Sequence, residues 1–550
     1  MTRTFRGADL IARTLSVASI ERLFTLSGNQ IMPIFDACID EEIALIHVRH
    51  EAAAVHMADA VGRLTGEPGV ALLTAGPGHA NALSAMYVAW AAESPLVVLS
   101  GHAPRAQLTR GAFQEMAQAE LAGHVAKASW TVSDASQLGH DLARAMRTAK
   151  TGRPGPVHLS LPADLLETAV DDSPQNLPQP DDCHPGITLL DVQTAEDILS
   201  ALSRAKRPLV LAGPSIMRST AEAQHEELSR ALGVPVIGME SPRGINDPSL
   251  GAVAEILAEA DLVLLLGKRL DFTLRFGAEP AFNSACRFIH VDPETHVLEH
   301  TAAALAGNER FLLAAMADAL PAAARLLELA EKFQRPDNGW FDEVQAALSF
   351  RPTEWKSLDS SAAGTLHPVE IGAVVHSFLA ADDDAVFIAD GGEFGQWAQA
   401  CVAAPQRLIN GPSGSIGSSI PFALGARTVH PDARIVTMLG DGTFGFHGME
   451  FDTAVRHRLP FIAVIGNDAC WNAEKQIQLR DFGSDRQIGC ELLPTRYDEL
   501  VRVMGGYGEH VTATEEMGPA LERAFASGLP ACVNVSLDGQ PAPVIRRKSC

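Results

Sequence analysis

The chain has 550 residues, more than one hydrophobic core normally supports, and this length predicts about three or four domains. Lys and Arg number 43 against 67 Asp and Glu, and the resulting net charge of −24 disfavours nucleic acid and anionic membranes as partners. The apolar runs have the length of strands, and the eight cysteines form neither a CxxC pair nor a zinc-like cluster. The first 15 residues lack the long apolar core of a signal peptide, so we expect a soluble, cytoplasmic protein.

Residues 1–170 alternate short apolar runs with Gly-containing turns and helical patterns. The run VALLT at 70–74 predicts a buried strand that leads through a Gly-Pro-Gly turn into a helix. PLVVLSG at 95–101 and GPVHLSLP at 155–162 repeat the strand and its exit loop. This alternation indicates a parallel sheet with helices on both faces.

Two further segments have the same texture. A Pro- and Asp-rich stretch at 170–186 predicts a linker, and residues 187–335 then contain strand patterns such as RPLVLAGPS and RFIHVDPE. Residues 366–550 contain AVFIADGG, RIVTMLGDG and PFIAVIGND. The predicted fold class is therefore α/β, with three doubly wound parallel-sheet domains at 1–170, 187–335 and 366–550.

The third segment holds a candidate metal site. RIVTML predicts a strand, GDGT its exit turn, GMEFDTAVRHR a helix facing the sheet, and FIAVIG the next strand. In such a βαβ unit the GDG turn and the ND turn at 467–468 leave the same sheet edge. Asp441 would offer a carboxylate and the glycines would let backbone N–H groups approach a phosphate, as a Mg²⁺–diphosphate site requires. The plain alternative is a helical crossover with two polar turns.

Two other stretches bear on this choice. VRHEAAA at 48–54 follows a predicted strand and places Glu51 at the start of an apolar helix. GPSGSIGSSIPFALGA at 411–426 gathers Gly and Ser around one large residue, Ile416. Taken alone, Glu51 fits a carboxylate stabilised by the helix dipole, and Ile416 fits a core residue.

In this order the three stretches resemble the thiamine-diphosphate enzymes of the acetohydroxyacid synthase, pyruvate decarboxylase and oxalyl-CoA decarboxylase group. The resemblance covers essentially the whole chain. It implies an N-terminal pyrimidine-binding domain, a middle domain and a C-terminal diphosphate- and Mg²⁺-binding domain. It also implies a homodimer or homotetramer with active sites at the chain interface. Further matches are GPGHANAL (76–83), GAFQE (111–115), GRPGPVHLSLP (152–162) and LPFIAVIGND (459–468).

The resemblance also assigns cofactor contacts. Glu51 would hydrogen-bond N1′ of the aminopyrimidine and promote formation of the C2 ylide, while the carbonyl of Gly414 would accept from the 4′-amine. Ile416 would wedge between the two rings and bring 4′-N to C2. The implied cofactor-binding set is Glu51, Gly391, Gly392, Glu393, Gly414, Ser415, Ile416, Gly440, Asp441, Gly442, Thr443, Asp468, Cys470 and Trp471.

The metal ligands follow from the same resemblance by counting. In the relatives the second ligand lies 27 residues after the GDG aspartate, a position that Asp468 occupies here. The third ligand would be the backbone oxygen of Cys470, which leaves Asn467 as a neighbour of the site. A carboxylate in place of an amide oxygen suits Mg²⁺ and adds one negative charge.

The candidate catalytic residues come from several loops. The implied catalytic set is Glu51, Glu474, Asn29, Gln30, His79 and Gln114. Glu474 matches an active-site carboxylate of the pyruvate decarboxylases, although a solvated carboxylate on a helix explains it nearly as well.

The reaction is less specified than the cofactor. We expect a C–C bond lyase or carboligase, acetolactate synthase-like, acting on a small 2-keto acid or related 2-hydroxyacyl compound through an enamine. FQE at 113–115 favours a synthase, whereas GKRLDFTLRFG at 267–277 resembles the oxalyl-CoA decarboxylase and 2-hydroxyacyl-CoA lyase branch. Residues 238–252 lack the glycine-histidine signature associated with FAD, so bound FAD is disfavoured. The alternatives from other classes are a nucleotide-binding oxidoreductase, for which LAGPSIM is a poor GxGxxG match, and a silent cofactor-binding paralogue.

Overall fold

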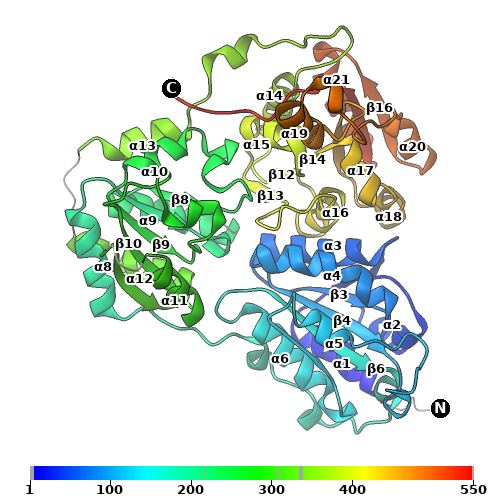
Figure 1. The fold of residues 1–550 in the computed structure, drawn as a ribbon. Helices are drawn as coiled ribbons and strands as arrows, with labels where there is room; N and C mark the ends of the chain where they lie inside the picture. Colours follow the sequence, from blue (N-terminus) through cyan, green and yellow to red (C-terminus); the bar gives the residue numbers. More distant parts are fainter. Residues whose placement is uncertain (1–4, 217–218, 306–308, 334–337, 548–550) are drawn as a thin grey trace. The chain divides into compact units, whose positions relative to one another are not determined.

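A computed structural model describes residues 5–216, 219–305, 309–333 and 338–547. Within these ranges the strands form three separate sheets, and every pair of neighbouring strands is parallel (Figure 1). This confirms the predicted class of three parallel-sheet α/β domains. The domain limits at 1–170, 187–335 and 366–550 stay predictions. In the described part of the chain, no helix combines the length and apolar character needed to cross a membrane.

The first sheet has the strand order β2-β1-β3-β4-β6-β5. The chain crosses from β1 to β2 on one side and to β3 on the other, so the sheet has a topological switch point between β1 and β3. The strands are β1 (Arg22–Thr25), β2 (Ala44–His47), β3 (Gly69–Leu73), β4 (Leu96–His102), β5 (Ala128–Thr131) and β6 (Pro156–Pro162). The helices are α1 (Gly7–Val17), α2 (Met32–Asp40), α3 (Glu51–Thr65), α4 (Pro77–Ala91), α5 (Gln118–Ala122), α6 (Leu138–Lys150) and α7 (Ala163–Glu167).

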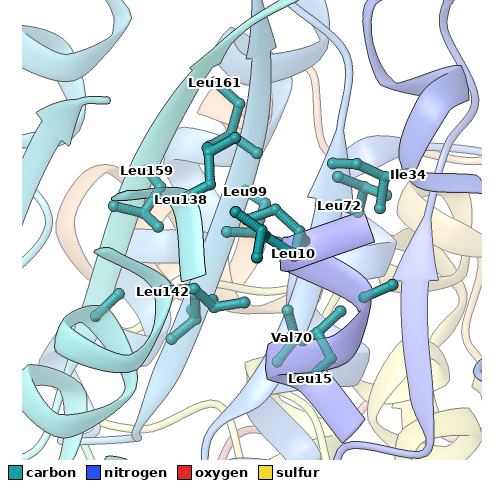
Figure 2. Packing of buried hydrophobic residues seen from close by; sticks show 14 of the residues in the cluster. Leu10, Leu15, Ile34, Val70, Leu72, Leu99, Leu138, Leu142, Leu159 and Leu161 are labelled. Atoms are coloured by element: carbon teal, nitrogen blue, oxygen red, sulfur yellow. The ribbon is translucent and has the colours of Figure 1, made fainter. Parts of the chain in front are cut away.

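Helices α1 and α6 cover one face of this sheet. Leu10 and Leu15 of α1 pack with Leu142 of α6 against strand residues of β3, β4 and β6 (Figure 2). The strands β3 and β4 are buried along their whole length, as expected for a parallel sheet covered on both faces. Burial of these side chains is the main favourable term that holds the layer together.

The second sheet has the order β11-β10-β9-β7-β8. Successive residues of β7 point into different cores, since Val210 belongs to one buried cluster and Leu209 and Leu211 to another. The strands are β7 (Pro208–Ala212), β8 (Val236–Gly238), β9 (Leu262–Leu266), β10 (Arg287–Asp292) and β11 (Phe311–Met316). The helices are α8 (Val192–Arg204), α9 (Ser219–Leu232), α10 (Val253–Glu259), α11 (Thr295–Ala304), α12 (Ala319–Leu329) and α13 (Trp340–Leu348).

The third sheet has the order β13-β12-β14-β15-β17-β16, with its switch point between β12 and β14. The strands are β12 (Val386–Ala389), β13 (Gln406–Ile409), β14 (Ile435–Gly440), β15 (Ile462–Asn467), β16 (Tyr507–Val511) and β17 (Ala531–Ser536). The helices are α14 (Pro368–Leu379), α15 (Gly392–Cys401), α16 (Ser419–Val429), α17 (Asp441–His447), α18 (Glu450–His457), α19 (Asn472–Phe482), α20 (Tyr497–Val503) and α21 (Thr514–Ala526).

The three sheets form two compact units. The first unit contains Met1–Gly186 together with Ile420–Asp432 and His447–Pro460, so α18 belongs with the first sheet. The second unit contains the second and third sheets. We predicted that the apolar face of the helix after GDG would cover the sheet of its own flanking strands. Phe451 and Ala454 are buried as predicted, but α18 packs in the first unit.

Four buried histidines in the first unit predict acid sensitivity. Burial lowers the pKa of His56 and His447 to about 3 and that of His79 to about 4, and it holds the pKa of His158 well below the ordinary value. The unfolded chain binds protons that these imidazoles refuse, so their full stability is present above about pH 6.5 and is lost as the pH falls. At pH 5 each costs about 2 kcal/mol of unfolding free energy.

Thermal unfolding between pH 8 and pH 5 measures this effect. The unfolding temperature of a His56→Asn protein is expected to fall less steeply with acidification than that of the wild type. Replacement of the exposed His184 by Asn is the matched control and is expected to leave the slope unchanged. Identical slopes for wild type and His56→Asn would contradict the assignment.

Candidate active site

Glu51 is the first residue of α3, immediately after the loop that leaves β2. Its carboxylate is nearly buried, with 8% of the residue exposed. The imidazole of His50 caps the helix by accepting a hydrogen bond from the backbone N–H of Ala52 at 3.1 Å. A carboxylate in the first turn is favoured by the helix dipole, so this position stabilises the charged form of Glu51.

The turn before Glu51 is held by a second carboxylate. Glu450 of α18 accepts hydrogen bonds from the backbone N–H groups of Arg49 at 3.0 Å and His50 at 3.1 Å. Its other partner is the Thr453 hydroxyl at 2.6 Å. Glu450 is 1% exposed, and burial raises its pKa. Because these bonds satisfy N–H groups at the helix entrance, Glu450 fixes the position from which Glu51 projects.

Polar side chains gather at the switch point of the first sheet. Gln30, just after β1, donates from Nε2 to Oε1 of Gln114 at 2.9 Å, and its own Oε1 accepts from the Thr74 hydroxyl at 2.6 Å. The structure thus brings together two of the residues that the sequence assigned to the substrate side. Asn29 is exposed beside them, at the start of a 3-10 turn.

The loop that carries Gln114 is closed on itself. Glu115 accepts hydrogen bonds from the backbone N–H groups of Thr109, Gly111 and Ala112, and these bonds lower its pKa. Between the two anchored residues, Phe113 is 72% exposed. An exposed aromatic ring on a fixed loop suits contact with another surface or with a substrate.

His79 is placed apart from these groups. Its ring is fully buried, lies 4.4 Å from the ring of His158 between centroids, and contacts the Ser100 hydroxyl at 2.9 Å. The role of His79 as a catalytic residue stays a prediction, and this burial favours a structural role beneath the switch point.

On the third sheet, Asp390 organises the predicted diphosphate loops. The carboxylate follows β12 and accepts from the backbone N–H groups of Gly391 at 2.7 Å, Gly417 at 3.1 Å and Ser419 at 3.1 Å. It is fully buried, and burial raises its pKa. One side chain therefore joins the 390–392 turn to the 411–419 loop. Gly392 has a φ of +80°, and the space where its Cβ would stand is open, so a ligand can approach this backbone closely.

The 411–419 loop presents the predicted cofactor contacts. Asn410 donates from Nδ2 to the carbonyl of Ser415 at 2.9 Å, which stiffens the loop from the β13 side. Ile416 is half-buried, and its Cγ2 packs close to Gly391. Gly414 is exposed. An apolar side chain held on a hydrogen-bonded loop suits the wedge role that the resemblance implies.

Asp441 and Asp468 bring two buried carboxylates together at the ends of β14 and β15. Asp441 is 2% exposed and begins α17 directly, where we had predicted an exit turn; Thr443, in the same turn of helix, is also buried. Burial raises the pKa of Asp441 to about 6. Burial and then the charge of Asp441 raise the pKa of Asp468 to about 7, although Lys475 opposes this. Backbone N–H groups of Ala469 and Cys470 also reach Asp441.

Asn467 is occupied by other partners. Its Nδ2 donates to the carbonyl of Thr495 at 2.8 Å and to Oδ1 of Asn534 at 3.2 Å. Cys470 is buried, and the N–H of Trp471 donates to the carbonyl of Cys490 at 2.7 Å. The Trp471 ring packs beside Gly442. These contacts are consistent with Asp468 as the metal-facing residue and Asn467 as a structural neighbour.

The residues present fit a divalent cation. Oδ2 of Asp441 is buried and has no hydrogen-bond partner in the described structure, and a second carboxylate lies beside it. Within the described ranges no cluster of three or more His, Cys, Asp or Glu side chains could hold a metal. A cation here would therefore need further oxygens from the backbone and from a bound diphosphate, which is the ligand set that Mg²⁺ accepts.

Two more carboxylates lie at the edge of this region. Glu393 stands in the first turn of α15, and burial raises its pKa, with a smaller contribution from the charge of Glu474 and an opposing one from Arg243. Glu474 is exposed in the first turn of α19. The structure thus places the predicted catalytic Glu474 within electrostatic reach of the predicted cofactor residue Glu393.

Several residues at these sites were not singled out from the sequence. Thr74, Asn81, Asp390 and Glu450 all bond directly to predicted site residues or to their loops. Asp390 and Asn81 lie inside the motifs DGGEFGQW and GPGHANAL, so a polar side chain within a glycine motif was the available signal. Glu450 gave no such signal, because its partners are about 400 residues away.

Glycine-rich turns and buried carboxylates at the carboxyl ends of parallel strands define an α/β cofactor-binding enzyme. Sequence models of the thiamine pyrophosphate enzymes match three regions: the N-terminal TPP binding domain at residues 5–121, the central domain at 195–316 and the C-terminal TPP binding domain at 390–535. The chain therefore belongs to the thiamine pyrophosphate enzyme family, as a thiamine diphosphate-dependent lyase or carboligase.

Individual relatives fall into two groups. A probable acetolactate synthase of Mycobacterium bovis is 35% identical over 559 residues, covering 100% of this chain and 98% of the relative. The 2-hydroxyacyl-CoA lyase 2 of Homo sapiens is 31% identical over 551 residues, covering 91% and 84%. The protein of the same name from Caenorhabditis elegans is 30% identical over 595 residues, covering 96% and 87%.

Proposed function

We propose that the chain binds Mg²⁺ and the diphosphate of thiamine diphosphate at Asp441, Asp468 and the backbone oxygen of Cys470. The observation that carries this proposal is the pair of buried carboxylates, one with an unpartnered oxygen. Two such charges in a dry site are costly unless a cation compensates them. The turns at 390–392 and 440–443 and the 411–419 loop supply backbone groups for the diphosphate.

In the same proposal Glu51 handles the proton at N1′ of the aminopyrimidine, and the Gly414 carbonyl accepts from the 4′-amine. Ile416 holds the two rings in the angle that brings them together, so part of the reaction barrier is offset by orientation. Bound thiamine diphosphate supplies the electron sink for cleavage or formation of a bond to a carbonyl carbon. On the substrate side we place Asn29, the hydrogen-bonded pair Gln30 and Gln114, and Glu474.

We place these sites at the chain interface of a homodimer or homotetramer in the cytoplasm. The exposed Phe113 on its closed loop supports such an interface. Light scattering on the purified protein tests it, and a monomer at micromolar concentration would contradict it.

For the substrate we favour a 2-keto acid donor, in keeping with the acetolactate synthase that is similar over the whole chain. The second candidate is a 2-hydroxyacyl-CoA compound, supported by GKRLDFTLRFG at 267–277 and by the relatives named 2-hydroxyacyl-CoA lyase 2.

A substrate screen separates the two candidates. The purified protein is supplied with thiamine diphosphate, Mg²⁺ and either pyruvate, longer 2-keto acids or 2-hydroxyacyl-CoA donors, and CO₂, aldehyde and ligated products are measured. We expect CO₂ release from a 2-keto acid. Cleavage of acyl-CoA donors alone would establish the second candidate, and no turnover with any donor would contradict both.

A further inference from the structure

Asn81 contacts the carboxylate of Glu51 directly. Its Nδ2 donates to Oε2 of Glu51 at 2.9 Å. The two residues come from neighbouring helices of the first unit, since Glu51 begins α3 and Asn81 lies in the second turn of α4. A hydrogen bond from a neutral donor to a carboxylate is stronger than one between neutral groups, and it fixes one of the two oxygens.

The start of α4 is shaped to approach this carboxylate. Gly78 lies in its first turn, and a Cβ there would stand 2.6 Å from Cγ2 of Thr74 and 3.3 Å from Oε1 of Glu51. Only glycine therefore lets the helix come this close without displacing its neighbours. The glycine and the asparagine are one turn apart on α4, so one helix supplies both the close approach and the hydrogen bond.

The backbone of Glu51 is fixed independently by Glu450 and the His50 cap, but the side chain still has three rotatable bonds. With Oε2 committed to Asn81, rotation of the carboxylate group is restricted and Oε1 keeps one orientation. We propose that Asn81 is a positioning residue, which holds the Glu51 carboxylate in the orientation required for proton transfer with the aminopyrimidine ring. This inference rests on the proposed function, because it takes thiamine diphosphate as the ligand of Glu51.

The test compares four variants. Asn81→Leu and Asn81→Asp keep the approximate size of the side chain and remove its N–H donor, whereas Asn81→Gln keeps an amide that can reach Glu51. Ser84→Ala, at an exposed position further along the same helix, is the matched control. Folding of each variant is checked by circular dichroism before use.

Two measurements are made on each protein. The first is the rate of hydrogen–deuterium exchange at C2 of bound thiamine diphosphate, read by NMR after acid quench. The second is the dissociation constant of the cofactor by calorimetry in the absence of substrate. For Asn81→Leu and Asn81→Asp we expect exchange about 10- to 100-fold slower, since a catalytic group misplaced by about 1 Å loses about that factor. The dissociation constant is expected to change by a smaller factor, Asn81→Gln to recover part of the rate, and Ser84→Ala to match the wild type.

A crystal structure of ligand-free Asn81→Leu adds a readout that needs no cofactor. The Glu51 carboxylate is expected to turn away from its place beside Gly78. Wild-type exchange rates in Asn81→Leu and Asn81→Asp, or equal losses in Asn81→Gln and Asn81→Leu, would overturn the positioning role alone. A wild-type protein that binds no thiamine diphosphate would overturn the proposed function and this inference with it.

Discussion

Replacing Glu51 by glutamine is expected to leave thiamine diphosphate bound while turnover falls by about 10²- to 10⁴-fold, the usual contribution of a positioned acid–base group. The amide keeps the shape of the side chain and one oxygen acceptor, so the first turn of α3 and the contact with Asn81 are preserved. It cannot exchange a proton with N1′. Cofactor occupancy by thiochrome fluorescence and steady-state rates with the best donor from the substrate screen measure the two effects separately.

A suitable control is Glu67→Gln, which removes an exposed carboxylate just beyond the other end of the same helix. That protein is expected to retain wild-type turnover. Full activity in Glu51→Gln would remove Glu51 from the mechanism. Loss of cofactor together with loss of activity would assign Glu51 to binding rather than to proton transfer.

Replacing Asp441 by alanine is expected to weaken Mg²⁺-dependent cofactor binding by more than about 100-fold, because even residues that only support metal ligands contribute about 10- to 100-fold. The side chain is buried at the end of β14, so its loss removes a ligand without disturbing the exposed surface. Calorimetric titration of thiamine diphosphate at several Mg²⁺ concentrations measures the change. Unaltered affinity in Asp441→Ala would place the diphosphate elsewhere.

Asp468 and Asn467 provide the sharper comparison within the same turn. Asp468→Ala is expected to lower Mg²⁺ affinity, whereas the contacts of Asn467 with Thr495 and Asn534 predict a loss of stability for Asn467→Ala. Asp468→Asn removes the like-charge repulsion with Asp441, so its metal-free form is expected to unfold at a higher temperature than the wild type at pH 8. Normal Mg²⁺ and diphosphate binding by Asp468→Ala would show that the count of 27 residues assigns the wrong ligand.

Local features of the third sheet were predictable from the sequence. The strands on both sides of GDG and the buried face of the following helix follow from hydrophobic periodicity, which reports how a segment is patterned. The position of Asp468 followed from a fixed spacing along one βαβ unit. The start of α17 at Asp441 was missed, because a glycine-flanked aspartate suits both an exit turn and the first turn of a helix.

Long-range partners were not predictable in the same way. Periodicity identified Phe451 as buried but could not tell which sheet α18 covers, and the structure groups this helix with the first sheet. The bonds of Glu450 to Arg49 and His50, and of Asn81 to Glu51, join elements whose approach depends on packing of the whole unit. No pattern within either segment encodes that approach, so the residues that position Glu51 emerged only from the structure.

Calorimetric titration of the purified wild-type protein with thiamine diphosphate tests the central claim most directly. In the presence of Mg²⁺ we predict saturable binding of one cofactor per chain, and after removal of Mg²⁺ by EDTA we predict that this binding is lost. Absence of binding in the presence of Mg²⁺ would contradict the assignment of Glu51, Asp441 and Asp468 to a thiamine diphosphate site.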